Sequence, residues 1–267
     1  AAPASDLEHY VALDADQGAV HTQRHLAPST AQMSMQERAT LAWLMMDREI
    51  QQNEAYRGAG STASVLLLHS LDVPTAPWYA SEYLAVTTVQ LGDTRLVLCD
   101  AETGEAIPLT RLHHPDDPIE SDRLSRQGAG VLTDSFGESR FLGTLANTRT
   151  FGATLAKRYG MPAEPEVQTH ILQGSRFAFI AGFSDGIGDV MTDQELVDEC
   201  RYASHPQQAA ERIMKYAEDL GAEDNATILC IPLRGWGAIR GEDRTALQRR
   251  DRRLNTDIYR NRRNLCR

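Results

Sequence analysis

Acidic residues stand at the ends of short apolar runs in this sequence. The clearest run, Phe177 to Phe183 (FAFIAGF), is short and rich in Phe, so it predicts a buried strand. The next residues, Ser184-Asp185-Gly186, place a carboxylate where that strand meets solvent, and Gly186 permits a sharp turn. A carboxylate in this position is costly unless it is paired, and a metal ion is the usual partner.

The same arrangement occurs at two other places. Gly92-Asp93 closes the run from Leu84 to Leu91, and Asp224-Asn225 precedes the run from Thr227 to Ile231. Three carboxylates at three strand ends can converge on one edge of a sheet, and Mg²⁺ and Mn²⁺ take oxygen sites of this kind while keeping several waters. The pattern therefore predicts a Mg²⁺ or Mn²⁺ site, with the alternative that each Asp only caps a turn.

Gly182 to Gly186 also matches GxSxG, the nucleophile elbow of serine hydrolases. That chemistry requires an acid and then a His after the Ser, and His205 is the only His downstream of Ser184. The short remaining segment disfavours this alternative. The adjacent pair His113-His114 is a second candidate, but neighbours on an extended segment point to opposite faces, so we expect a structural or surface role.

Capping signals predict the helices. Ser34 and Glu37 form a capping box that opens a helix to about Gln52, and Thr192 and Glu195 form another that opens a helix through about Arg201. A further helix is expected to begin at Pro206 and to stop at Gly221. These last two helices should pack on the sheet that carries the Asp residues.

Apolar runs predict the strands. Ser64 to Leu68 is one, preceded by a Gly-rich segment that is not a P-loop because no GK[ST] follows. The runs Leu84 to Leu91 and Arg95 to Cys99 are separated by only three residues, which favours an antiparallel hairpin.

Composition limits the class of protein. The 267 residues are 42% hydrophobic, which allows a sizeable core, and no stretch reaches the roughly 18 apolar residues of a membrane span. No secretory signal is visible in the opening AAPAS. Cys99 and Cys230 lie in apolar runs, and the four cysteines form neither a zinc pattern nor a disulfide framework, which suits a reducing compartment.

Charge is distributed unevenly. From Arg234 onward there are 11 Arg against 4 acidic residues, a charge of +7, so the net charge of −10 leaves −17 on the rest of the chain. An acidic body argues against a nucleic-acid-binding core. The Arg-rich tail is a candidate for contact with RNA or with an acidic protein, and its alternative is a solvated or self-docking tail.

Six segments, in order, resemble motifs of the type 2C protein phosphatases, the metal-dependent Ser/Thr phosphatase family. The family motifs are GSTA, GDSR, LTxDH…ExxRI, LAxSRxxGD, SDGxWD and DNxT. The matching segments, within about residues 57 to 233, are Gly60-Ser61-Thr62-Ala63, Leu91 to Arg95, Leu109 to Leu124, Leu145 to Gly152, Ser184 to Asp189 and Asp224 to Thr227. Three features resemble a fungal, mitochondrial branch of the family. They are the sequence GSTAS, the segment Asp134 to Arg140, and Trp236 followed by Asp243-Arg244-Thr245.

The resemblance implies an α+β fold with two packed, mainly antiparallel β-sheets flanked by α-helices, an α-β-β-α sandwich that is incomplete at its N-terminal side. It also implies metal ligands for Mg²⁺ or Mn²⁺. Asp185 and Asp224 match ligand positions, Asp93 matches a ligand of a third, weaker metal, and Asp189 matches a supporting position. The implied reaction is hydrolysis of a phosphoprotein substrate by a metal-activated water, without a protein nucleophile.

Parts of the family pattern are missing. The DGHGG segment, with an Asp that bridges two metals, is not in the chain, and neither is the Arg that grips the phosphate, so no catalytic residue is identified. Ala153 stands where the GD motif has Asp, and Gly188 replaces the usual Trp. Two hypotheses remain: part of a working phosphatase whose missing segment is supplied otherwise, or a catalytically inactive pseudophosphatase that serves as a structural or binding module.

The expected organisation has three parts. Residues 1–33 form a loose lead-in, residues 34–233 form the phosphatase-like domain, and residues 234–267 form the Arg-rich tail. The resemblance implies a mitochondrial location, and we expect a soluble protein without a membrane span.

Overall fold

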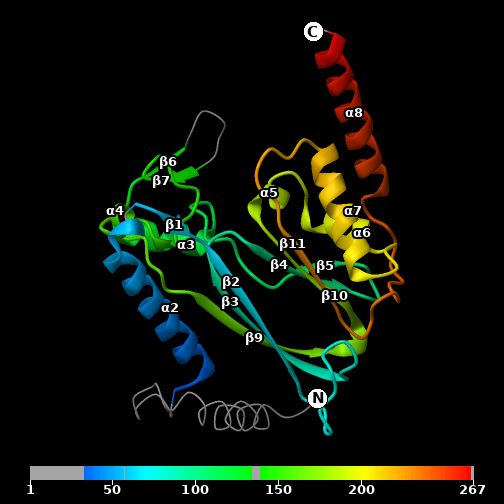
Figure 1. Ribbon diagram of the computed structural model, residues 1–267, viewed down its shortest axis with the longest axis horizontal. Coiled ribbons are helices and arrows are strands. Elements are labelled where there is room, and N and C mark those ends of the chain that lie inside the picture. The colour runs from blue at the N-terminus through cyan, green and yellow to red at the C-terminus, as the bar shows by residue number, and fades with distance from the viewer. Residues whose placement is uncertain (1–32, 57, 134–138, 266–267) are drawn as a thin grey trace. The chain divides into compact units, whose positions relative to one another are not determined.

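The computed structural model describes residues 33–265 except Arg57 and 134–138, so the lead-in lies outside the described residues apart from Met33. The chain divides into two compact units (Figure 1). Unit 1 comprises Ala1–Leu66, Thr87–Gly92 and His113–Thr169, and unit 2 comprises Leu67–Val86, Asp93–Leu112 and His170–Arg267. None of the helices in the described part of the chain has both the length and the apolar character that a bilayer crossing requires.

Unit 2 is built on a four-stranded antiparallel sheet with the order β11-β10-β4-β5. The strands are β4 (Arg95–Asp100), β5 (Ala106–Pro108), β10 (Phe177–Phe183) and β11 (Ile228–Pro232). The central strand β10 is buried along nearly its whole length because helices cover the sheet. Its helices are η3 (Gly174–Arg176), α5 (Asp185–Gly188), α6 (Asp193–Cys200), α7 (Pro206–Asp219) and α8 (Ala246–Leu265).

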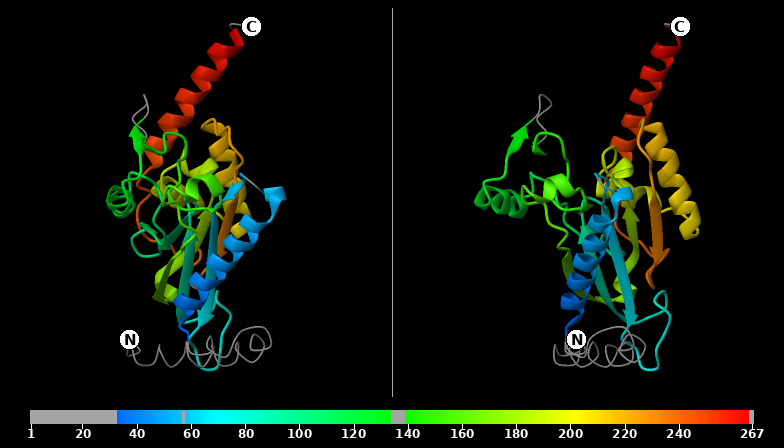
Figure 2. Two further views of the ribbon diagram at one scale, coloured as in Figure 1. Left: turned by 90° about the vertical axis from the view of Figure 1, so that its left-hand side faces the viewer. Right: turned by 60° about the vertical axis from the view of Figure 1, so that its left-hand side comes forward.

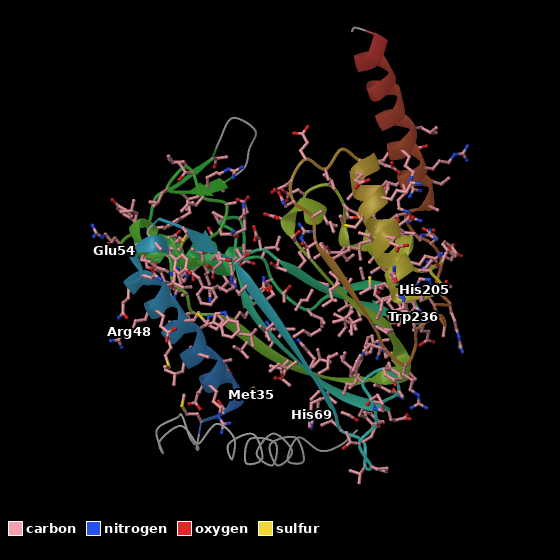
Figure 3. All side chains as sticks on the ribbon, viewed as in Figure 1. Met35, Arg48, Glu54, His69, His205 and Trp236 are labelled. Carbon is pink, nitrogen blue, oxygen red and sulfur yellow. The ribbon has the colours of Figure 1, made fainter. Side chains whose placement is uncertain are left out.

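The core of unit 2 joins the sheet to α6 and α7. Phe179 and Phe183 of the sheet belong to the same buried cluster as Leu196 of α6 and Ile213 of α7. Figures 1 and 2 show α7 lying alongside β11. Trp236 closes one end of this cluster, with its ring 5.6 Å from that of Phe179 (Figure 3).

Unit 1 consists of helices and short antiparallel pairs. Its helices are α2 (Met35–Gln52), η2 (Glu54–Tyr56), α3 (Pro118–Arg126) and α4 (Thr154–Lys157). Its paired strands are β1 (Gly60–Ser61) with β8 (Phe151–Gly152), and β6 (Val131–Thr133) with β7 (Ser139–Phe141). A three-stranded sheet of order β2-β3-β9 takes residues from both units: β2 (Ala63–Ser70), β3 (Tyr83–Leu91) and β9 (Glu166–Gln173).

The predicted helix starts are confirmed. Ser34 and Glu37 form the capping box of α2, and Thr192 and Glu195 form that of α6. Pro206 opens α7, and Gly221, two residues beyond its end, has φ +88°, a conformation that glycine adopts without strain.

The predicted hairpin of Leu84 to Leu91 with Arg95 to Cys99 is wrong, since β3 and β4 belong to different sheets. Gly92 follows the last residue of β3 with φ +109°. Its backbone N–H and carbonyl form hydrogen bonds with His113 instead of with β4. The Gly92 N–H donates to His113 Nδ1, and the His113 N–H donates to the Gly92 carbonyl, both at 3.0 Å. A short connection was therefore not sufficient to pair the two strands.

Candidate metal-binding turns and the surrounding site

Two acidic turns lie beside neighbouring strands of unit 2. One follows β10 and the other precedes β11. Asp185 comes just after β10 and begins α5, and its Oδ1 accepts a hydrogen bond from the Gly186 N–H at 2.8 Å. Asp224 comes shortly before β11, and its Oδ1 accepts from the Asn225 N–H at 2.7 Å. Both side chains are exposed to solvent. Each carboxylate stabilises its own turn while remaining accessible from outside.

Hydrogen bonds fasten these two turns to each other. The Ser184 N–H donates to the Thr227 carbonyl at 3.1 Å, and the Thr227 N–H donates back to Ser184 Oγ at 3.0 Å. Ser184 Oγ in turn donates to the Asn225 carbonyl at 3.4 Å. A Cβ on Gly186 would lie 2.4 Å from that carbonyl oxygen, so only glycine allows the turns to approach this closely.

The residues of the serine-hydrolase alternative have structural roles. The Ser184 hydroxyl braces the two acidic turns, as just described. His205 is the N-cap residue of α7, and its Nδ1 accepts from the Gln208 N–H at 3.2 Å (Figure 3). Both side chains are therefore explained by local backbone hydrogen bonds rather than by nucleophilic catalysis.

The sheet register brings Asp93 to the same end as the other two carboxylates. Arg95 of β4 pairs with Phe183 of β10, which also pairs with Ile228 of β11. Asp93 precedes Arg95 by two residues, and Asp185 follows Phe183 by two residues. Antiparallel neighbours place these positions beyond one end of the sheet. The convergence of the three side chains on one metal site stays a prediction.

The donor set is suited to a hard cation but is incomplete. Within residues 33–265, apart from the gaps, no three His, Cys, Asp or Glu side chains gather closely enough to hold a metal ion. Mg²⁺ is commonly bound through only one or two carboxylates and keeps several waters. The exposed carboxylates of Asp185 and Asp224 fit such an ion, provided that further oxygen ligands come from water or from another segment.

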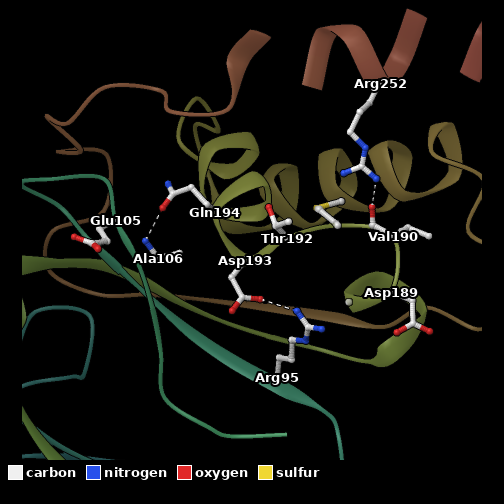
Figure 4. Close-up of a pocket in the computed structure, with 11 residues that line it drawn as sticks. Arg95, Glu105, Ala106, Asp189, Val190, Thr192, Asp193, Gln194 and Arg252 are labelled. Carbon is white, nitrogen blue, oxygen red and sulfur yellow. Dashed lines mark hydrogen bonds and ion pairs between the residues drawn. The ribbon is translucent and has the colours of Figure 1, made fainter. Parts of the chain in front are cut away.

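A pocket of about 580 Å³ lies beside the loop that follows Asp185 (Figure 4). It is lined by Asp189, the predicted supporting residue, together with Arg95, Asp193 and Arg252. Arg95 pairs with Asp193 at 3.1 Å, and a Cβ on Gly188 would meet Arg95 Nε at 3.0 Å. Because Gly188 has no side chain, the Arg95 side chain can lie close to the backbone at this position.

A buried glutamate organises the motif residues of unit 1. Glu120 of α3 is 1% exposed and accepts hydrogen bonds from Arg123 at 2.8 Å, from Arg149 at 2.5 Å and from Thr148 at 2.5 Å. Burial alone would raise the pKa of Glu120, but the hydrogen bonds from Arg149, Arg123 and Thr148 outweigh it and lower this pKa to about 2. This ion cluster has a structural role.

The predicted structural role of His113-His114 agrees with the contacts. His113 is buried, accepts from the Gly92 N–H through Nδ1 and places Nε2 3.6 Å from a carboxylate oxygen of Glu166. His114 Nδ1 accepts from the Asp116 N–H at 3.3 Å. Each side chain stabilises a different turn of the backbone.

The arginines of α8 were not recognised as contributors to this site. Arg249 pairs with Asp243 at 2.8 Å, Arg252 with Glu195 at 2.6 Å and Arg253 with Glu199 at 3.1 Å. The self-docking alternative therefore holds for these three arginines. The segment Asp243-Arg244-Thr245 could have indicated that a helix begins after it. Asp243 accepts a hydrogen bond from the Thr245 N–H, just before the first residue of α8.

Comparisons with known proteins agree on one family. The chain matches the family described as Protein phosphatase 2C over residues 4–226. It is 42% identical over 161 residues to Protein phosphatase 2C homolog 4 of Schizosaccharomyces pombe. It is 31% identical over 178 residues to the mitochondrial Protein phosphatase 1K of Xenopus laevis. The alignments cover 60% and 67% of this chain but 41% and 44% of the relatives, so the chain spans less than half the length of these relatives.

A solved structure supports the fold. The serine-threonine phosphatase 2C from Toxoplasma gondii matches with a TM-score of 0.54 at 21% identity, over 82% of this chain and 75% of that chain. The predicted fold class is confirmed, with antiparallel sheets and helices packed on them. Because the family match covers most of the sequence, the chain belongs to the protein phosphatase 2C family.

Proposed function

We propose that this chain carries the metal-binding turns of a protein serine/threonine phosphatase. The observation that supports the proposal best is the mutual fastening of the Asp185 and Asp224 turns through Ser184 and Gly186. Turns that only reversed the chain would not need to approach so closely. The family membership supports a phosphoprotein as substrate.

In this proposal Asp185 and Asp224 are ligands of Mg²⁺ or Mn²⁺, Asp93 contributes to a third, weaker ion, and Asp189 supports the loop. When bound, such ions activate water as a nucleophile and stabilise the negative charge that grows on the phosphate. The protein's own contribution is to keep the two turns in register and open to solvent. Residues 34–233 remain the proposed phosphatase-like domain.

The second candidate is a pseudophosphatase that acts as a structural or binding module. It is favoured by the absence of DGHG from this sequence and by Ala153 at the position of a family Asp. The two candidates differ in hydrolysis of a phosphopeptide and in binding of a divalent cation.

The deciding experiment measures Mn²⁺-dependent hydrolysis of a phosphopeptide by the purified chain. If the enzyme proposal holds, Asp185→Asn should reduce the rate by at least about 100-fold, because loss of a residue that merely supports a metal ligand already costs about 10–100-fold. Asp122→Asn is the matched control, since Asp122 is an exposed residue of α3 and its loss should leave the rate unchanged.

Thermal unfolding gives the second measurement. Mn²⁺ should raise the melting temperature of the wild-type chain and not that of Asp185→Asn, because a ligand stabilises only a protein that binds it. No hydrolysis, together with no effect of Mn²⁺ on melting, would exclude the enzyme for this chain and favour the pseudophosphatase. Metal binding that becomes tight only after a DGHGG-containing segment is added would identify an incomplete but competent site.

Location and partners are part of the proposal. A mitochondrial location is supported by the resemblance of these motifs to a fungal, mitochondrial branch of the family and by the similarity to the mitochondrial relative from Xenopus laevis. A protein or RNA partner of the tail would contact arginines other than Arg249, Arg252 and Arg253, which pair within the chain.

A further inference from the structure

Helix α6 begins directly after the loop that carries Asp185 and Asp189, and it buries three carboxylates. Glu195 and Asp198 are 0% exposed and Glu199 is 5% exposed. Buried carboxylates are strongly destabilising unless they are paired and hydrogen-bonded. The partners of these side chains therefore determine how firmly the start of α6, and the loop before it, are fixed.

The C-terminal segment Thr245–Arg253 supplies four of these partners, alongside Thr192, Arg201, Arg212 and Tyr216. The Thr245 N–H and Oγ1 donate to Asp198 Oδ2 at 3.0 and 2.9 Å. Arg249 and Arg253 each pair with Glu199 at 3.1 Å, and the Arg253 guanidinium lies 4.4 Å from the centre of the Tyr216 ring. These contacts dock α8 on α6 and α7 but do not involve the acidic loop.

Arg252 makes a different set of contacts. Its Nη1 donates to both carboxylate oxygens of Glu195, at 2.7 and 2.6 Å. Its Nη2 donates to the Val190 carbonyl at 2.5 Å, as Figure 4 shows. Val190 follows Asp189 directly, so a single guanidinium connects α8, the first turn of α6 and the acidic loop.

We propose that the segment Thr245–Arg253 is an intramolecular clamp for the loop Asp185–Met191, with Arg252 as its positioning residue. The family match ends at residue 226, so the clamp lies outside the part of the chain that this match covers. The consequence for metal binding rests on the proposed function, whereas the effect on the loop does not. The hydrogen bonds described above join Arg252 to Val190 and Glu195, neither of which is a proposed metal ligand.

The loop contains its own reporters. Its backbone N–H groups donate within the turn, including Asp189 to the Asp185 carbonyl at 2.8 Å and Met191 to the Ile187 carbonyl at 3.1 Å. Hydrogen–deuterium exchange of a peptide spanning residues 186–191 therefore measures how often the loop opens. This measurement needs neither metal nor activity.

The test compares Arg252→Met with Arg253→Met in the full chain. Both variants remove one arginine of α8 that pairs with an acid of α6, so both should lower the melting temperature. Only Arg252→Met should speed exchange of the 186–191 peptide, by about tenfold, because it removes a charged hydrogen bond to the loop. It should also weaken Mn²⁺ binding, measured by calorimetry, by roughly tenfold.

Arg252→Lys keeps the proposal testable if the Met variant does not fold. Lysine keeps the charge beside Glu195 but lacks the planar fork that reaches two acceptors at once. Its melting temperature should approach that of the wild type while exchange of the 186–191 peptide remains faster.

Equal exchange of this peptide in the wild type, Arg252→Lys and Arg253→Met would overturn the clamp. Wild-type protein that binds no Mn²⁺ would instead count against the proposed function, and the exchange results would still decide the clamp.

Discussion

At the residue scale, Asp185 and Asp224 stabilise their own turns and stay open to solvent, whereas Ser184 joins the two turns. Asp185 and Asp224 could be predicted at strand ends because a short apolar run defines where its strand stops. The role of Ser184 could not, because its hydroxyl bonds to Asn225 and Thr227, more than 40 residues later in the chain. Local sequence therefore located the carboxylates but not the brace between them.

Ala153 gives a residue-scale prediction. It has φ 45° and ψ 50°, the left-handed conformation that costs a residue with a Cβ about 1–2 kcal/mol. Ala153→Gly should therefore raise the free energy of unfolding by about 0.5–1 kcal/mol, after the extra entropy of glycine in the unfolded chain is subtracted. Urea unfolding would measure the change.

Ala156→Gly is the matched control for this prediction. Ala156 is buried within α4 and has an ordinary helical role, so the same substitution there should destabilise the protein. A loss of stability in both variants would contradict the strain assigned to Ala153.

At the element scale, helices with clear caps were predicted and helices stabilised by ions were not. The capping boxes and Pro206 located α2, α6 and α7. Helix α3 was missed although Asp117 caps it and Pro118 follows, because its surroundings are polar and lack an apolar stripe. Helix α8 was missed for the same reason, since its arginines rather than an apolar face attach it to α6.

The anchor of α3 gives a prediction about pH. The pKa of Glu120 in the folded protein is about 2, against an ordinary value of 4.5, so the ionised side chain stabilises the fold fully above pH 4.5. That contribution, roughly 3 kcal/mol, should be lost progressively as the pH falls from about 5 toward 2. Thermal or urea unfolding at pH 7, 5 and 3 would follow the loss.

Glu120→Gln tests the assignment. It should lower stability at pH 7 by about 3–5 kcal/mol, because Arg123 and Arg149 would lose a buried carboxylate partner. It should also flatten the fall in stability between pH 5 and 3. Glu54→Gln, at an exposed position of η2 (Figure 3), should leave both the stability and its pH dependence near wild type. An unchanged pH dependence in Glu120→Gln would show that other groups dominate acid unfolding.

At the scale of the whole molecule, the uneven charge of the sequence has a partly internal explanation. The tail of +7 and the body of −17 meet where α8 lies on α6, so part of the tail's charge is used inside unit 2. The sequence showed the charge asymmetry but not this pairing, because the paired residues are more than 40 positions apart. The family motifs, in contrast, predicted the fold class correctly because they mark the strand ends and turns of the two sheets.

Two truncations give a prediction at this scale. A chain that stops after Thr245 lacks α8, so Glu195 loses Arg252, and Glu199 loses Arg249 and Arg253 but keeps Arg212. Because these carboxylates are buried, the free energy of unfolding should fall by at least about 3–5 kcal/mol. A chain that stops after Asp257 keeps Arg249, Arg252 and Arg253, and its stability should fall by much less. Urea unfolding of both truncated chains beside the 267-residue chain measures the difference. Equal losses in the two truncations would mean that the distal half of α8, rather than the ion pairs with α6, stabilises unit 2.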